Sequence, residues 1–223
     1  MGIKMKDVKL RWQDAFKERK FVVSFFVSLI MFAGLMLFLS DFQSNIELRE
    51  GVVFKDPLFG DTAPAAVDLL LFIAIYSVHL IAVIAAFTRP EKAVQIALGY
   101  FFVFFFRIFA LYLLPLNPPE GTIPLYDPIL IWFGKGEIIT KDLFYSGHTA
   151  TTFMVFLVTT NKKIRCFIGI SLLIIVYGVL IQKLHYSIDV YIAFFVAYTA
   201  YRVSTIIVNK LNFKFCNRKL EEN

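Results

Sequence analysis

The chain has 223 residues, of which 58% are hydrophobic and 17% aromatic, and its formal net charge is +6. Its mean hydropathy of +0.69 excludes an ordinary soluble globular domain and indicates an integral membrane protein. The positive residues are separated by long apolar runs, which fits the orientation rule of membrane proteins rather than a nucleic-acid interface. We therefore expect an all-α membrane protein. Its partner is expected to be the lipid bilayer, and we expect no binding of nucleic acid.

Residues 1–20 form a basic amino-terminal segment that holds seven Lys or Arg residues. Apolar side chains recur in it at helical spacing, at Met5, Val8, Trp12, Ala15 and Phe16. Such a segment can lie as a basic interfacial helix on an anionic leaflet. A solvated cytoplasmic tail fits the same residues, and the sequence leaves both interpretations open.

Six apolar runs follow, and each predicts a membrane-spanning helix. The first run is too long for a signal-peptide core and lacks a cleavage site after it, so we expect it to be retained. Residues 21–209 are thus predicted to be one six-span domain, followed by a basic tail at 210–223. The runs are Phe21–Ser40, Val67–Phe87, Ala93–Leu114, Ser146–Thr160 with the residues before it, Cys166–Lys183, and a last one from Leu184 or Ser187 to Val208.

The connections between the runs set the predicted orientation. Asp41–Ala66 and Pro115–Tyr145 predict longer loops, whereas Thr88–Lys92 and Asn161–Arg165 predict short turns. The amino-terminal segment, the turns and the tail hold most of the 23 Lys and Arg residues, and the two loops hold four. Both termini are therefore predicted to be cytoplasmic, and the two loops external.

The sequence predicts no disulfide, no metal and no cofactor. Cys166 and Cys216 both fall on the predicted cytoplasmic side, where thiols stay reduced, so we expect no disulfide. The chain offers no acidic cluster for a metal, and we expect neither a metal nor a cofactor. His79 falls inside the second run, and we interpret it as a hydrogen-bonded core residue outside any site.

Several ionisable residues fall inside the apolar runs, where their cost indicates a function. Arg107 lies seven residues before the outer end of the third run, about 10 Å deep at a rise of 1.5 Å per residue. His148 lies at the start of the fourth run, and His185 and Asp189 lie at the start of the sixth. Because alternate spans run in opposite directions, all four side chains are expected in one layer near the external face.

This layer predicts a site for phosphate chemistry. A guanidinium offers a planar set of donors to phosphate oxygens, one histidine can attack phosphorus, and a second can protonate the leaving oxygen. His185 and Asp189 are four residues apart, so a helix would let the carboxylate accept a proton from one imidazole nitrogen. A hydrogen-bonded cap or a proton path would use the same pair.

Ser146, Gly147 and His148 are expected to begin a helix after a loop. Ser146 is suited to be its N-cap, and Gly147 allows close approach to the backbone. Because free amide groups at a helix start bind anions, Ser146 and Gly147 join Arg107 as predicted phosphate-binding residues. Taken alone, a plain N-cap explains the Ser-Gly-His-Thr sequence equally well.

Two segments resemble the signature motifs of the sphingomyelin synthases, the membrane branch of the type-2 phosphatidic acid phosphatase superfamily. They are Asp142–Thr149 and His185–Val190, and the segment from Arg107 to Pro115 resembles the arginine segment of that branch more loosely. The likeness covers residues 93–205. It implies six spans, cytoplasmic termini and an active site on the periplasmic, exoplasmic or lumenal face.

The resemblance also implies roles for the site residues. His185 would be the nucleophile, Asp189 its orienting carboxylate and His148 the general acid-base. A phospho-headgroup would pass from a glycerophospholipid through a phosphohistidine-type intermediate to a lipid alcohol such as ceramide, with release of diacylglycerol. With water as the acceptor, the same residues would make a lipid phosphatase or phospholipase C-like hydrolase. A non-enzymatic proton-coupled carrier is the third hypothesis.

The chain departs from the phosphatase members of that superfamily at two places. They carry a Ser-Arg pair seven and six residues before the second histidine, where this chain has Gly178 and Val179. The Lys and Arg-Pro of their first motif are missing around Arg107. Both absences favour the sphingomyelin synthase branch, and Lys183 is the predicted substitute for the missing phosphate-binding cations.

Overall fold

A computed structural model describes residues 5–59, 63–126 and 139–217, and these ranges contain helices and no β-strand. The all-α prediction is confirmed for this part of the chain. In chain order the helices are α1 (Met5–Phe16), α2 (Arg19–Glu47), α3 (Asp68–Thr88), α4 (Pro90–Leu113), α6 (Gly147–Val158), α7 (Lys162–Ile181), α8 (Ser187–Leu211) and α9 (Lys214–Asn217).

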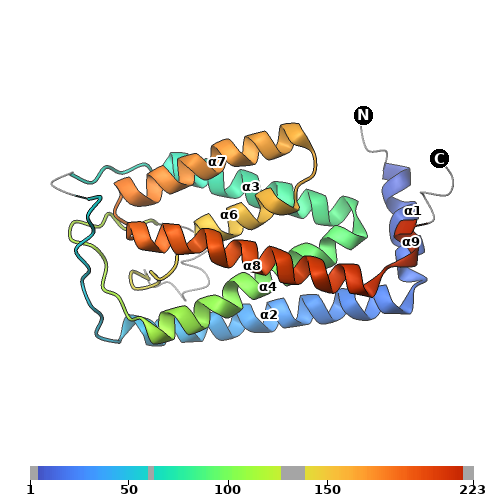
Figure 1. Ribbon diagram of the computed structural model, residues 1–223, viewed down its shortest axis with the longest axis horizontal. Helices are drawn as coiled ribbons and strands as arrows, with labels where there is room; N and C mark the ends of the chain where they lie inside the picture. Colours follow the sequence, from blue (N-terminus) through green and yellow to red (C-terminus); the bar gives the residue numbers. More distant parts are fainter. Residues whose placement is uncertain (1–4, 60–62, 127–138, 218–223) are drawn as a thin grey trace.

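Helices α2, α3, α4, α7 and α8 are each long and apolar enough to cross a membrane. They lie side by side as a bundle, with the shorter α6 among them (Figure 1). Helices of this length and composition are those of a multi-pass integral membrane protein, as the composition predicts.

The predicted fourth span, Ser146–Thr160, differs from this pattern because α6 has only 12 residues. A helix needs about 20 apolar residues to cross the hydrocarbon core, so α6 alone is too short. The helix begins at Gly147 because the Ser146 hydroxyl accepts a hydrogen bond from the Thr149 amide at 3.4 Å and caps it. Ser146 is thus the N-cap that the sequence predicts, whereas six complete spans stay a prediction.

The predicted first external loop starts later than expected. Helix α2 continues past Ser40 to Glu47, because Gln43 and Ile46 are buried on the face that packs against the rest of the bundle. The polar residues of this last stretch therefore extend the helix instead of ending it.

The two predicted turns at the opposite end are shorter than expected. Thr88–Lys92 reduces to Arg89, because Pro90 opens α4 at the first helical position, where its missing N–H costs nothing. In the second turn, the side chain of Asn161 accepts hydrogen bonds from two backbone N–H groups, so α7 begins directly after it.

Helix α4 lies at the centre of the bundle and packs against α2, α3, α6 and α8. The largest buried cluster joins α3, α4, α6, α7 and α8. On α8 it contains Ala193, Ala197 and Ala200, which share one face and are fully buried. Small side chains at this spacing let neighbouring helices approach closely, so α8 can lie directly against α4 and α6.

The two ends of the described chain meet at one end of the bundle (Figure 1). Glu18 accepts hydrogen bonds from the backbone N–H groups of Lys214, at 2.8 Å, and Phe215, at 3.4 Å. The rings of Phe21 and Phe213 lie 5.5 Å apart. This contact agrees with the prediction that both termini lie on the same side of the membrane. That this side is the cytoplasm stays a prediction, as do the segment boundaries at residues 21 and 210.

Parts of four predicted segments lie outside the described residues. They are residues 1–4 of the amino-terminal segment, residues 60–62 of the first loop, residues 127–138 of the second loop, and residues 218–223 of the tail. Cys166 is an exposed free thiol, and the side chain of Cys216 also lies outside the described part.

Gly178 of α7 is packed so tightly against α3 that a side chain has no space. A Cβ atom there would lie 2.5 Å from Cδ2 of Leu71, which is fully buried. We expect Gly178→Ala to lower the free energy of unfolding by about 1–3 kcal/mol, as overpacked cores do. A lower melting temperature of the purified protein in detergent would measure it.

Gly34→Ala is the matched control, because nothing lies within 4 Å of a Cβ at that position of α2. Alanine favours the helix over glycine, so this variant should melt no lower than the unmodified chain. Equal melting temperatures for the two variants would contradict the tight contact.

Candidate active site

The predicted site residues gather at the end of the bundle opposite to α1, where α4 ends and α6 and α8 begin (Figure 1). Arg107 lies in the last two turns of α4, and His148 is the second residue of α6. His185 lies two residues before α8, and Asp189 is the third residue of α8. The expected layer of ionisable side chains at one end of the bundle is therefore present.

His185 and Asp189 lie next to each other, as their spacing predicts, although Nδ1 of His185 makes no hydrogen bond among the described residues. Nδ1 of the imidazole lies 3.4 Å from Oδ2 of the carboxylate, and the two residues are 5% and 0% exposed. The same Oδ2 accepts a hydrogen bond from the backbone N–H of Tyr186 at 2.9 Å, which fixes the carboxylate at the start of α8. Because Nδ1 faces Asp189, Nε2 is the ring nitrogen on the opposite edge and is the one suited to a substrate.

Arg107 is buried and held in one orientation. Its Nε donates to Oδ1 of Asp142 at 2.9 Å, and its Nη2 donates to the backbone carbonyl of the same residue at 2.8 Å. The guanidinium carbon also lies 5.7 Å from the ring centroid of Tyr145. Within the described residues, Nη1 has no hydrogen-bond partner although it is buried. The two N–H donors of Nη1 are therefore left for a ligand, while Asp142 pairs with Nε and Nη2.

The start of α6 lies against this guanidinium. A Cβ atom at Gly147 would come within 3.4 Å of both Cζ and Nη1 of Arg107, which is the close approach that the glycine predicts. The backbone N–H of Ser146 donates to the carbonyl of Asp189 at 3.2 Å and so ties the start of α6 to the start of α8. Helix-start amides next to a cation form a local environment that favours an anion.

Lys183 takes a different position from the other predicted phosphate-binding residues. It follows Gln182, the C-cap residue of α7, in the left-handed backbone region, with φ of 53°, and its carbonyl accepts a hydrogen bond from Thr122 at 2.9 Å. Its ammonium lies 5.6 Å from the ring centroid of Phe59. These contacts place Lys183 beside both of the longer loops, and its binding of phosphate stays a prediction.

Asp56 belongs to this end of the bundle, although the sequence indicates only a turn there. It is 6% exposed, and its carboxylate accepts hydrogen bonds from the backbone N–H of Ser187 and from its hydroxyl, the latter at 3.0 Å. A carboxylate at a helix start is stabilised by the free amides and the helix dipole. The loop between α2 and α3 thus fixes the start of α8, two residues after His185.

Tyr186 connects the same helix start to both external segments. Its hydroxyl accepts from the backbone N–H of Phe54 at 3.1 Å and donates to the carbonyl of Asn117 at 2.9 Å. Burial raises the pKa of this hydroxyl, so it stays a protonated donor. Tyr186, which directly follows His185, therefore holds the start of α8 in place.

Gly178 and Val179 occupy the positions where phosphatase members of the superfamily carry Ser and Arg. Val179 is fully buried against α3, and its carbonyl accepts the backbone N–H groups of Leu184 at 2.9 Å and His185 at 3.3 Å. A large charged side chain has no space in this packed interface. The close packing of α7 against α3 therefore agrees with an uncharged residue at position 179.

His79 is a hydrogen-bonded residue of α3, as the sequence analysis proposes. Its Nδ1 lies 2.7 Å from the carbonyl oxygen of Ile75, one turn earlier, and its ring lies 5.8 Å from that of Tyr100. Both contacts are within the helix bundle, so His79 is not needed to explain the site.

Comparison with known proteins gives a match to one superfamily over part of the chain. A family model for the C-terminal part of the PAP2 superfamily matches residues 141–206, which contain His148, His185 and Asp189. No curated protein matches the chain. The family match supports the type-2 phosphatidic acid phosphatase superfamily, and with it an enzyme of the lipid phosphatase and phosphotransferase type. Membership of the sphingomyelin synthase branch stays a prediction.

The loop carboxylate at Asp56 gives a testable expectation. Asp56→Ala removes the acceptor at the start of α8, so the free energy of unfolding should fall by about 1 kcal/mol, as for a lost helix cap. Because that helix start holds His185 and Asp189, we also expect lipid headgroup turnover to fall at least tenfold. Thermal unfolding and a headgroup-release assay measure the two effects.

Glu50→Gln is the control for charge in the same loop, since Glu50 is exposed. It should leave both quantities unchanged. Unchanged turnover in Asp56→Ala would show that the loop does not position the site.

Proposed function

We propose that the chain is a membrane lipid phosphotransferase that moves a phospho-headgroup from a glycerophospholipid to a lipid alcohol such as ceramide. The observation that carries this proposal is the buried His185–Asp189 pair beside the α6 start that Arg107 contacts. The proposal includes six spans, cytoplasmic termini and an active site that opens to the external face.

The first half-reaction loads the headgroup onto His185. Its Nε2 attacks phosphorus, and the bond from phosphorus to the diacylglycerol oxygen breaks. Protonated His148 gives its proton to that oxygen, so diacylglycerol leaves as a neutral alcohol. Asp189, facing Nδ1, stabilises the positive charge that develops on the imidazole.

The second half-reaction transfers the phospho-headgroup from His185 to the acceptor alcohol. His148, now neutral, takes the proton from the acceptor hydroxyl as its oxygen attacks phosphorus. The bond between phosphorus and Nε2 breaks, which restores both histidines to their starting states. Throughout, Nη1 of Arg107 and the first amides of α6, next to Ser146 and Gly147, stabilise the phosphoryl oxygens, with Lys183 as a further cation.

Burial supports a lipid alcohol rather than water as the acceptor. Arg107, His185 and Asp189 are between 0% and 5% exposed, and exclusion of water from a site suppresses hydrolysis of a reactive intermediate. The packed Gly178–Val179 segment supports the same branch, because it replaces the phosphatase Ser-Arg pair. The superfamily match also fits a lipid phosphatase or phospholipase C-like hydrolase, so the experiment must separate the two.

The test is an incubation of purified protein in liposomes with headgroup-labelled phospholipid, with and without ceramide. We expect label on ceramide, and we expect His185→Ala to lower its transfer at least a thousandfold because the nucleophile is lost. Asp189→Asn should retain more activity than His185→Ala. Chromatography of the lipid extract measures both.

His79→Gln is the matched control, a histidine replaced outside the site, and should keep normal transfer. Full activity in a folded His185→Ala variant would refute the mechanism. Label released into water whether or not ceramide is present would identify a hydrolase.

Lys183 can be tested without loss of stability. Glycine prefers the left-handed backbone region that Lys183 adopts, so Lys183→Gly should melt at the same temperature or slightly higher. If its ammonium binds phosphate, we expect headgroup transfer to fall about tenfold. Transfer at the unmodified rate in this stable variant would remove Lys183 from the site.

A further inference from the structure

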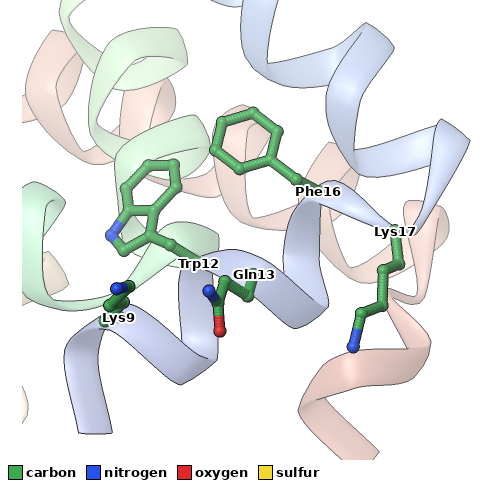
Figure 2. A pocket seen from close by; sticks show the side chains of 5 residues that line it. All are labelled: Lys9, Trp12, Gln13, Phe16 and Lys17. Carbon is green, nitrogen blue, oxygen red and sulfur yellow. The ribbon is translucent and has the colours of Figure 1, made fainter. Parts of the chain in front are cut away.

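Helix α1, at the end of the bundle away from the candidate active site, carries an open hollow lined by Lys9, Trp12, Gln13, Phe16 and Lys17 (Figure 2). We propose that this hollow is a second lipid site, which binds an anionic phospholipid of the adjoining leaflet. The proposal is independent of the reaction at the other end of the bundle.

The residues of the hollow form two neighbouring stripes along α1. Lys9 and Gln13 are four residues apart and exposed, so they share one face of α1, and the exposed Lys17 follows directly after the helix end at Phe16. Trp12 and Phe16 form an aromatic stripe beside them, and Figure 2 shows their rings together on one side of the helix. A basic stripe beside an aromatic one matches a lipid, whose charged headgroup adjoins its apolar chains.

Helix α1 is firmly docked, so the hollow exists before any ligand arrives. The indole Nε1 of Trp12 donates to the carbonyl of Phe87 at 2.7 Å, and its ring lies 5.3 Å from that of Phe25. Val8 and Ala15 are buried beneath the helix. A preformed site avoids the cost of ordering a free tail on binding, and the solvated-tail interpretation does not fit this packing.

The position of Trp12 indicates lipid rather than polypeptide as the occupant. Phe87 lies in the last turn of the apolar helix α3, so the indole lies at the level where that helix leaves the hydrocarbon. Met5, Leu10 and Phe16 on the same short helix remain 68%, 49% and 46% exposed. Apolar exposure at this level is stabilised by acyl chains, which a membrane supplies without a protein partner.

The charges around the hollow favour an anionic headgroup. Lys17 also contacts Asp14 at 2.8 Å, but both side chains are exposed, so this pair is weak and leaves other ammonium protons free to bind. Lys9 extends the positive face by two turns, and further basic residues lie in the turns at this end of the bundle. A phosphate-bearing anionic lipid is complementary to this face.

The experiment uses the fluorescence of Trp12 in liposomes. The chain has two tryptophans, so Trp132→Phe leaves Trp12 as the single reporter. Brominated phosphatidylglycerol and brominated phosphatidylcholine quench a tryptophan that they contact, and titration of each gives its relative association constant at the site. We expect phosphatidylglycerol to be preferred, and equal constants for the two lipids would overturn the proposal.

Paired lysine substitutions locate the effect. Each lysine near an anionic surface changes binding about fivefold, so Lys9→Gln with Lys17→Gln should lower the preference about twenty-fivefold. Lys6→Gln with Lys20→Gln removes the same charge outside the hollow and should lower it far less. An equal loss in both double variants would mean diffuse attraction and no site.

A second measurement needs no tryptophan substitution. Native mass spectrometry of the unmodified chain with phosphatidylglycerol should show a bound lipid that Lys9→Gln with Lys17→Gln removes. A bound lipid that persists in this double variant would likewise overturn the proposal.

Discussion

The candidate active site depends on the burial of one carboxylate. Asp189 is fully buried, and an uncompensated charge in that position would cost several kcal/mol. Its Oδ2 accepts the backbone N–H of Tyr186 and lies 3.4 Å from Nδ1 of His185, while its backbone carbonyl accepts the N–H of Ser146. A single residue thus lies against the predicted nucleophile, caps α8 and fixes where α6 begins. The position of His148 at the start of α6 follows from the last of these contacts.

The external segments complete this arrangement from outside the bundle. Asp56 binds the start of α8, and Glu47 at the end of α2 accepts hydrogen bonds from the backbone N–H groups of Thr140 and Lys141, at 3.0 and 2.9 Å. The chain then reaches Asp142, which holds Arg107. Residues of these two loops and of the end of α2 therefore determine the geometry of Arg107 and of the start of α8. Loops of this kind are part of the site's framework, not only connections between spans.

Sequence periodicity predicts what is local in this chain. The long apolar helices follow from hydropathy, the Ser146 cap from residue type, and the His185–Asp189 contact from a spacing of four residues. The pairing of Arg107 with Asp142 and of Asp56 with Ser187 joins residues 35 and 131 positions apart, which no local pattern encodes. Helix α6 is shorter than the predicted fourth span, because the helix begins only after its cap Ser146 and already ends at Val158.

Helix α6 has a consequence for how a substrate reaches the site. Its 12 residues rise about 18 Å, against about 30 Å of hydrocarbon. Lys92 donates to the carbonyl of Val158 at 3.1 Å and so holds the carboxyl end of α6 at the end of the bundle that carries the short basic turns. Measured from that end, α6 is too short to reach the full depth of the hydrocarbon, and the non-helical backbone just before it is partly covered by protein. In the proposed reaction, a lipid substrate reaches these groups by lateral diffusion, so the bilayer acts as a two-dimensional reservoir of substrate.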